Sequence, residues 1–170
     1  MTARVLVAGI GNVFHGDDGF GVEVARRLLA RGGLPDGAEV VDTGIRGLHL
    51  ALQLLDGYEA LVLIDTVRRG GEPGTVMLLE HDLDAPPPAA ALDGHGMDPA
   101  SVLALLDRLA EANDLERPLR RVLVVGAEPA VLDDGMGLSP AVAAAIGPAV
   151  DAVDELVRQL LETVPQGVHP

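Results

Sequence analysis

Short aliphatic runs alternate along this chain with segments whose apolar residues recur at helical spacing. Residues 4–10 (RVLVAGI), 38–41 and 60–64 (ALVLI) are rich in aliphatic side chains and lead into glycine or aspartate, which is typical of β-strands. Residues 21–33 and 48–55 have the apolar periodicity of amphipathic helices. The nearly continuous apolar run 60–64 is expected where helices cover both faces of a parallel sheet.

The second half of the chain interrupts this alternation. The connection 65–75, which contains GGEPGT, is too short for a helical crossover, so the strand expected at residues 76–79 should run antiparallel to the third strand. A fifth strand is predicted at residues 121–125. Helices are predicted at about 99–112 and 140–161, because each begins with a capping residue followed by proline.

These elements predict a single three-layer α/β/α domain over residues 1–170, with a mostly parallel five-stranded sheet and right-handed crossovers. Ligands of such sheets lie beyond the carboxyl ends of the strands, where the strand order reverses. In the common order 2-1-3, the first and third strands are neighbours at that point. The residues that leave these two strands are therefore the first place to look for chemistry.

Acidic residues stand at both of these positions. The loop after the first strand contains Asp17 and Asp18 between glycines, and Asp65 follows the third strand. One aspartate would suffice to cap the next helix, so a pair indicates a carboxylate presented for function, with capping as the alternative. Asp65 would be costly to ionise after an apolar run without a partner, and capping of the next turn is again the alternative. Two carboxylates this close repel each other unless a proton or a cation lies between them.

A histidine could complete a metal site with these carboxylates. His95 lies between two glycines in residues 81–97, a segment rich in Pro, Ala and Asp that is the one long irregular stretch of the chain. A lone loop histidine is more often a surface residue, and His15, beside the acidic loop, is the main rival. Two carboxylates and one imidazole suit a divalent first-row metal and leave positions open for other ligands. The weaker candidates are His49, His81 and His169.

Composition removes several classes of function. The formal charge of −14 argues against nucleic acid and anionic membranes as partners, since both bind through Lys and Arg. All 12 basic residues are arginine, so P-loop phosphate binding, Schiff-base catalysis and a lysine base lack their central residue. The absence of cysteine removes disulfides, thiolate metal sites and a cysteine nucleophile. No segment has the pattern of a signal peptide or a membrane span, so a cytoplasmic protein is expected, and a monomer.

Other functions of an α/β domain fit less well. A dinucleotide fingerprint would need glycine where Phe14 stands, and adjacent aspartates would repel a pyrophosphate. A metal-dependent, receiver-like regulatory module would need a lysine after its last strand. A small-molecule or nucleoside-processing enzyme would want aromatic stacking, and the chain has only 2 Phe and 1 Tyr. A serine acyl-enzyme is disfavoured because both serines, Ser101 and Ser139, stand at helical or capping positions.

Six segments of the chain resemble, in order, the hydrogenase maturation endopeptidases. They are GIGNVFHGDDGFG after the first strand, DTGIRG after the second, LIDTV followed by PGTV, a histidine in a loop before a helix, GAEP, and GLSP. Each is weak evidence alone, but together they span nearly the whole chain at compatible spacing. The resemblance implies a sheet in the order 2-1-3-5-4 with strand four antiparallel. It also implies that Gly126, Pro129 and residues 138–140 shape the loop after the fifth strand.

The resemblance further implies a metal-recognising, carboxylate-dependent peptidase. By the family pattern Asp18, Asp65 and His95 are the metal ligands, and Asp42 positions substrate or takes part in proton transfer. The expected substrate is a nickel-iron hydrogenase large-subunit precursor, recognised through its inserted nickel or another divalent metal, and cut near its C-terminus. Asp18 or Asp65 is expected to activate water, directly or through the metal. Some family members carry glutamate at the position of Asp18, which leaves the ligand type unchanged.

Overall fold

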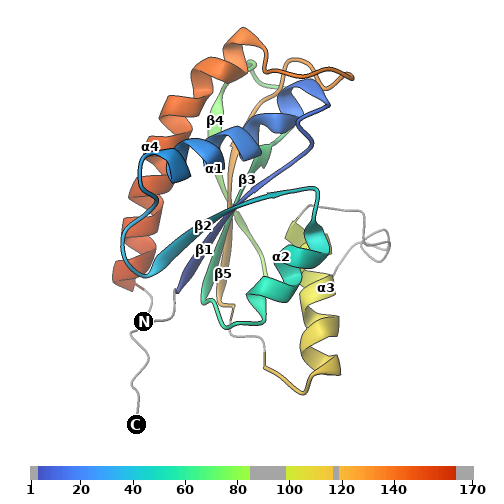
Figure 1. The fold of residues 1–170 in the computed structure, drawn as a ribbon, viewed down its shortest axis with the longest axis vertical. Coiled ribbons are helices and arrows are strands. Elements are labelled where there is room, and N and C mark those ends of the chain that lie inside the picture. Colours follow the sequence, from blue (N-terminus) through green and yellow to red (C-terminus); the bar gives the residue numbers. More distant parts are fainter. Residues whose placement is uncertain (1–3, 85–98, 117–118, 164–170) are drawn as a thin grey trace.

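The computed structural model of the protein describes residues 4–84, 99–116 and 119–163. These residues form one five-stranded sheet with helices on both faces (Figure 1). The strands are β1 (Val5–Ile10), β2 (Ala38–Gly44), β3 (Ala60–Thr66), β4 (Val76–His81) and β5 (Arg121–Ala127). The helices are the short 3-10 helix η1 (Gly16–Gly19), α1 (Phe20–Ala30), α2 (Gly47–Leu54), α3 (Pro99–Ala112) and α4 (Pro140–Thr163).

The strand order is β2-β1-β3-β5-β4. β1 pairs in parallel with β2 and β3, and β3 pairs in parallel with β5, whereas β4 is antiparallel to β5. The predicted order and the antiparallel fourth strand are therefore confirmed. The short connection after β3 sends the chain back in the opposite direction as β4, and β5 later fills the position between β3 and β4.

The two faces of the sheet have separate cores. Helices α1 and α4 cover one face and α2 and α3 cover the other (Figure 1). Alternate residues of β3 contribute to the two cores: Val62 and Ile64 pack toward α1 and α4, whereas Leu61 and Leu63 pack toward α2 and α3. This explains why the strand is apolar at every position from 60 to 64. Among the helices of the described ranges, none has both the length and the apolar content needed to cross a bilayer.

Strands β2 and β3 are longer than the sequence predicts, so two candidate residues lie inside strands instead of after them. Gly9 of β1 pairs with Asp42 of β2 on one side and with Ile64 of β3 on the other. Side chains alternate along a strand. Asp42 therefore projects toward α1, like Val40, while Asp65 follows the core residue Ile64 and projects to the opposite face.

Glycine at two positions allows α1 to approach the sheet closely at its carboxyl end. A Cβ atom on Gly21 would collide with the backbone carbonyl oxygens of Ile64 and Ile10, and one on Gly9 would collide with the carbonyl of Gly21. Only a residue without a side chain fits such a contact. The close approach brings the start of α1, and the η1 turn before it, against the residues that immediately precede Asp65.

Candidate active site

Asp65 is a partly buried carboxyl group near the carboxyl end of β3. Within the described ranges its side chain accepts one hydrogen bond, from the backbone N–H of Thr66 at 2.7 Å. Removal from water raises the pKa of Asp65 to about 7, and the negative charge of Asp18 adds to the rise, while the hydrogen bond from Thr66 opposes it. This carboxyl group can therefore gain or lose a proton near neutral pH.

Asp18 lies in η1, the turn between β1 and α1, and is partly exposed. Its Oδ2 atom accepts a hydrogen bond from the backbone N–H of Asn12 at 2.8 Å, which ties the turn back onto the end of β1. Gly11 makes this possible, because its φ of 124° belongs to the left-handed region and a Cβ there would collide with the carbonyl oxygen of Asp18. The loop thus holds the Asp18 carboxylate at the sheet edge.

The two carboxylates form an electrostatically coupled pair. They stand at the carboxyl ends of neighbouring parallel strands, Asp18 in the turn that follows β1 and Asp65 within the last residues of β3, and Asp18 acts on the pKa of Asp65. Each accepts a backbone hydrogen bond from its own loop, so several lone pairs remain for other partners. Such a pair favours either a shared proton or a bound cation. A divalent cation thus fits the donor chemistry of these two residues.

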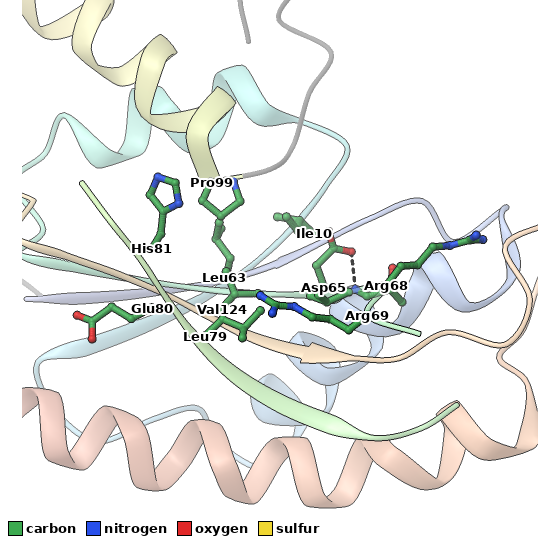
Figure 2. Close-up of a pocket in the computed structure, with 12 residues that line it drawn as sticks. Ile10, Leu63, Asp65, Arg68, Arg69, Leu79, Glu80, His81, Pro99 and Val124 are labelled. Atoms are coloured by element: carbon green, nitrogen blue, oxygen red, sulfur yellow. Dashed lines mark hydrogen bonds between the residues drawn. The ribbon is translucent and has the colours of Figure 1, made fainter. Parts of the chain in front are cut away.

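A cavity of about 410 Å³ adjoins Asp65 on the α2 and α3 face of the sheet (Figure 2). We call it the Asp65 cavity. Its floor is apolar, and charged or polar side chains stand at its edges (Figure 2). Its volume would admit several residues of an extended peptide or a small ligand. The lining includes Ile10, Leu63, Asp65, Arg69, His81 and Pro99.

Asp42 does not share this cavity. Its Oδ2 atom lies 3.1 Å from Nε of Arg26 on α1, and its side chain lines a separate depression beside α2 together with Arg46 and His49. Because Asp42 and Asp65 project to opposite faces of the sheet, the structure does not bring the three predicted catalytic carboxylates together. It brings together Asp18 and Asp65.

The predicted third metal ligand, His95, lies outside the described residues. Pro99, four positions later in the chain, lines the Asp65 cavity. The main rival of His95 as a ligand, His15, is half-exposed, and its Nε2 atom lies 3.4 Å from a carboxylate oxygen of Asp134. His81, a weaker candidate, lines the Asp65 cavity near Pro99 (Figure 2). Within residues 4–84, 99–116 and 119–163, no three His, Cys, Asp or Glu side chains are grouped as a metal site.

Asp17, the neighbour of Asp18, is fully buried and has a structural role. Its carboxylate accepts hydrogen bonds from the backbone N–H groups of Ala130, Val131 and Ser139, at 2.8, 2.8 and 2.7 Å, and from the Ser139 hydroxyl at 2.9 Å. Burial would raise the pKa of Asp17, but these donors outweigh that effect and hold it below its usual range. Asp17 therefore fastens the η1 turn to the loop between β5 and α4.

The sequence analysis missed two residues near the site. Glu128 is buried at the end of β5, and its carboxylate accepts hydrogen bonds from the backbone N–H groups of Arg69 and Gly70. Arg69 lines the Asp65 cavity. The signal that singled out Asp65, an acidic residue directly after an apolar strand, also applies to Glu128 in GAEP. For Arg69 no local signal existed, since adjacent arginines in a glycine-rich loop usually lie in solvent.

The fold and the site together define a class: an α/β protein with a pair of under-satisfied carboxylates at the switch point of its sheet, beside a cavity of peptide size. Comparison with known proteins narrows this class. The family model described as hydrogenase maturation protease matches residues 22–156. This stretch contains Asp65, β5 and most of α4. The chain belongs to the hydrogenase maturation proteases, a family of peptidases.

Individual relatives agree with this assignment. The chain is 37% identical over 158 residues to the hydrogenase expression/formation protein HupD of Rhodobacter capsulatus, covering 92% of this chain and 71% of that protein. It is 30% identical over 168 residues to the hydrogenase 2 maturation protease of Escherichia coli, covering 98% and 99%.

Solved structures give the same result. The hydrogenase maturating endopeptidase HybD from E. coli superposes with a TM-score of 0.71 at 30% identity, over 92% of this chain and 93% of that one. The [NiFe] hydrogenase maturation protease HybD from Thermococcus kodakarensis superposes with a TM-score of 0.66 at 26% identity, over 90% and 98%.

Proposed function

We propose that this protein is an endopeptidase that removes the C-terminal extension of a nickel-iron hydrogenase large-subunit precursor after recognising the nickel already inserted in it. Membership of the maturation protease family supports a peptidase acting in hydrogenase assembly. The observation that carries the finer proposal is the pairing of Asp18 with Asp65: removal from water raises the pKa of Asp65 to about 7, and the negative charge of Asp18 adds to that rise. A cation between them would relieve that repulsion.

In this proposal the metal arrives as part of the substrate. Asp18, Asp65 and His95 bind the nickel of the precursor, and another divalent metal could take its place. The lone pairs that remain on the two carboxylates support this role, since first-row divalent metals accept carboxylate oxygen and imidazole nitrogen. Metal recognition would also align the precursor, so that the bond to be cut lies over the Asp65 cavity.

Peptide hydrolysis then needs a group that takes a proton from the attacking water. We assign this role to Asp65, which lines the cavity, or to Asp18, because the hydrogen bonds that each carboxylate accepts among the described residues leave acceptor capacity for water. The proton is passed to the leaving amine as the C–N bond breaks. Ser139 is unsuited to nucleophilic attack because its hydroxyl donates to Asp17, and Ser101 is buried in α3. Asp42 lies on the opposite face, and we assign it to positioning the substrate.

The test is to incubate the purified protein with nickel-loaded and nickel-free precursor and to follow the mass of the large subunit. The proposal expects trimming of the nickel-loaded form alone. Trimming of both forms alike would retain the peptidase and remove metal recognition. Binding of the loaded precursor without any cleavage, under conditions where the protein is folded, would instead favour a metal-dependent binding module without peptidase activity.

A further inference from the structure

The Asp65 cavity has a cationic residue on its edge that the proposed hydrolysis does not use. Arg69 lies in the connection between β3 and β4, and its guanidinium has no carboxylate partner among the described residues. Four arginines of the described chain are paired with acidic residues: Arg26 with Glu23 and Asp42, Arg31 and Arg158 with Asp154, and Arg121 with Glu80. In a protein with a net charge of −14, an arginine left without an acidic partner beside a cavity calls for an explanation.

The direction of the Arg69 side chain distinguishes it from its neighbour. Figure 2 shows Arg69 running from the loop back toward Leu79 and Val124, along the floor of the cavity, whereas Arg68 extends the opposite way. Both arginines line the cavity, but their side chains extend in opposite directions, and that of Arg69 reaches toward Leu79 and Val124. Arg68 therefore tests whether the position of the charge in the cavity matters, or only its presence.

A buried carboxylate holds the backbone of this loop. Glu128 is 5% exposed, and its two carboxylate oxygens accept hydrogen bonds from the N–H of Arg69 at 2.8 Å and of Gly70 at 3.2 Å. The Glu128 backbone closes the other end of the loop, since its carbonyl accepts from Gly74 N–H at 2.8 Å and its own N–H donates to Thr75 at 3.0 Å. Glu128 therefore fixes the base of the Arg69 side chain, which lowers the entropy lost when its guanidinium binds a ligand.

The acidic residues of the same cavity leave the Arg69 charge uncompensated. Glu80 points away from Leu79 and Val124 in Figure 2, and it is engaged by Arg121 through two hydrogen bonds of 2.8 and 3.1 Å. Asp65 forms no ion pair with an arginine among the described residues, and Asp18 is the charged residue that acts on its pKa. In solution at physiological salt, exposed charges more than about 8 to 10 Å from the Arg69 guanidinium are largely screened from it. Arg69 and Arg68 are thus cationic residues of the cavity lining that form no ion pair among the described residues, and Arg69 is the one that reaches toward Leu79 and Val124.

We propose that Arg69, positioned by Glu128, binds a carboxylate of the peptide substrate while the substrate lies in the Asp65 cavity. A guanidinium matches a carboxylate with two parallel hydrogen bonds, and the apolar floor shields that contact from water. This inference rests on the proposed function in one respect, namely that the occupant is a segment of a protein substrate. The carboxylate belongs either to an acidic side chain of the C-terminal extension or to the terminal carboxyl group of the precursor.

Synthetic peptides that copy the C-terminal extension of the precursor and its flanking residues test the assignment by binding alone. Three versions are compared on the full-length protein: the native peptide, one with its acidic side chains replaced by amides, and one with an amidated C-terminus. The native peptide should bind the wild-type protein about 10- to 100-fold more tightly than the version that lacks the recognised carboxylate. Which modified peptide loses affinity identifies the source of that carboxylate.

Variants of the loop complete the experiment. Arg69→Gln should bind all three peptides equally weakly, Arg69→Lys should keep part of the preference, and Arg68→Gln should keep nearly all of it. Glu128→Gln should reduce the ratio of affinities for the native and modified peptides, which a loss of stability alone would leave unchanged. Equal losses in Arg68→Gln and Arg69→Gln, or equal affinity of wild-type protein for all three peptides, would overturn the assignment.

This binding experiment is independent of cleavage and of nickel. If the precursor is never trimmed but the carboxylate preference appears and disappears with Arg69, the peptidase proposal fails and the anion site stands. If trimming depends on nickel but the peptides bind without preference, the anion site fails and the peptidase stands.

Discussion

Asp17 and Asp65 are two aspartates at the same end of the sheet, and their surroundings are opposite. Asp17 is fully buried, yet four donors from the loop between β5 and α4 hold its pKa below the usual range. At Asp65, removal from water raises the pKa to about 7, the charge of Asp18 adds to the rise, and the hydrogen bond from Thr66 opposes it without cancelling it. Removal from water therefore has opposite outcomes at the two residues, because four donors outweigh it at Asp17 and the bond from Thr66 does not outweigh it at Asp65.

The comparison separates structure from chemistry within one sequence motif. A carboxylate whose lone pairs are filled by the protein cannot also bind a metal or accept a proton from water. A carboxylate left with open lone pairs next to a like charge is costly for the fold and is available to a substrate. Of the pair Asp17 and Asp18, the first is held by donors from the loop between β5 and α4, whereas the second accepts one backbone hydrogen bond among the described residues, from Asn12, and is the one to which we assign a function.

The largest effect is expected on processing of the precursor, at Asp18 and Asp65. Asp65→Asn or Asp18→Asn should reduce trimming of the nickel-loaded precursor by about 10²- to 10⁴-fold, because each removes a proposed ligand and base. The measurement is the mass of the large subunit over time, with circular dichroism to establish that both variants are folded. Trimming at the wild-type rate by both variants would remove the proposed site.

The next largest effect is expected on stability, at Asp17, whose carboxylate accepts four hydrogen bonds. Asp17→Asn should lower the free energy of unfolding at pH 7 by about 2 to 4 kcal/mol, because the amide nitrogen replaces an acceptor among three N–H groups and a hydroxyl. Urea denaturation measures this loss, and Asp18→Asn is the matched control in the adjacent residue.

The pH dependence of that loss provides a check. Because the pKa of folded Asp17 lies below its value of 3.8 in the unfolded chain, its stabilising contribution is complete above pH 3.8 and is lost as the pH falls through the folded pKa. The difference between wild type and Asp17→Asn should therefore be full at pH 7 and smaller in strong acid. A loss of stability that is independent of pH would assign the effect to packing.

Asp65 should show the opposite sign. Its pKa is about 7 in the folded protein against 3.8 for the ordinary group, so stability present below pH 3.8 is lost as the pH rises to about 7. Asp65→Asn removes this penalty, and we expect the variant to exceed wild type by roughly 1 to 3 kcal/mol at pH 8 and to match it near pH 4. Urea denaturation at both pH values tests this, and a constant difference would contradict it.

The smallest effect is expected at Asp42, on the far face of the sheet. Asp42→Asn breaks the ion pair with the half-exposed Arg26 and leaves the Asp65 cavity intact. Trimming should fall by no more than about tenfold, in KM and with kcat unchanged, as for a residue that positions substrate. Arg26→Gln, which breaks the same ion pair, is the control. A loss as large as that of Asp65→Asn would return Asp42 to the reacting centre.

Much of the fold could be predicted from the pattern of apolar residues. The five strands, the antiparallel β4 and the starts of α3 and α4 agree with the structure, because each depends on local periodicity, on a proline at a helix start or on the length of a connection. The ends of β2 and β3 were predicted too early. Pairing with β1 and β5 extends them by hydrogen bonds that a single strand cannot predict.

The candidate site was predicted in part. Asp18 and Asp65 could be paired because the ends of neighbouring parallel strands meet, and the structure couples them electrostatically. Asp42 could not be excluded from this group, since the face on which a strand residue projects depends on register. Glu128 and Arg69 meet only through the turn after β3, which links parts of the chain that are far apart in sequence.

The sequence by itself determined which elements form and which residue types stand at the carboxyl ends of β1 and β3, because periodicity and strand order are local or topological properties. Only the tertiary structure decided which carboxylate has its lone pairs filled by hydrogen-bond donors and which keeps lone pairs available. That distinction depends on hydrogen-bond donors from segments distant in the sequence, which for Asp17 are Ala130, Val131 and Ser139. The sequence around an aspartate does not indicate how many donors will surround it in the folded protein.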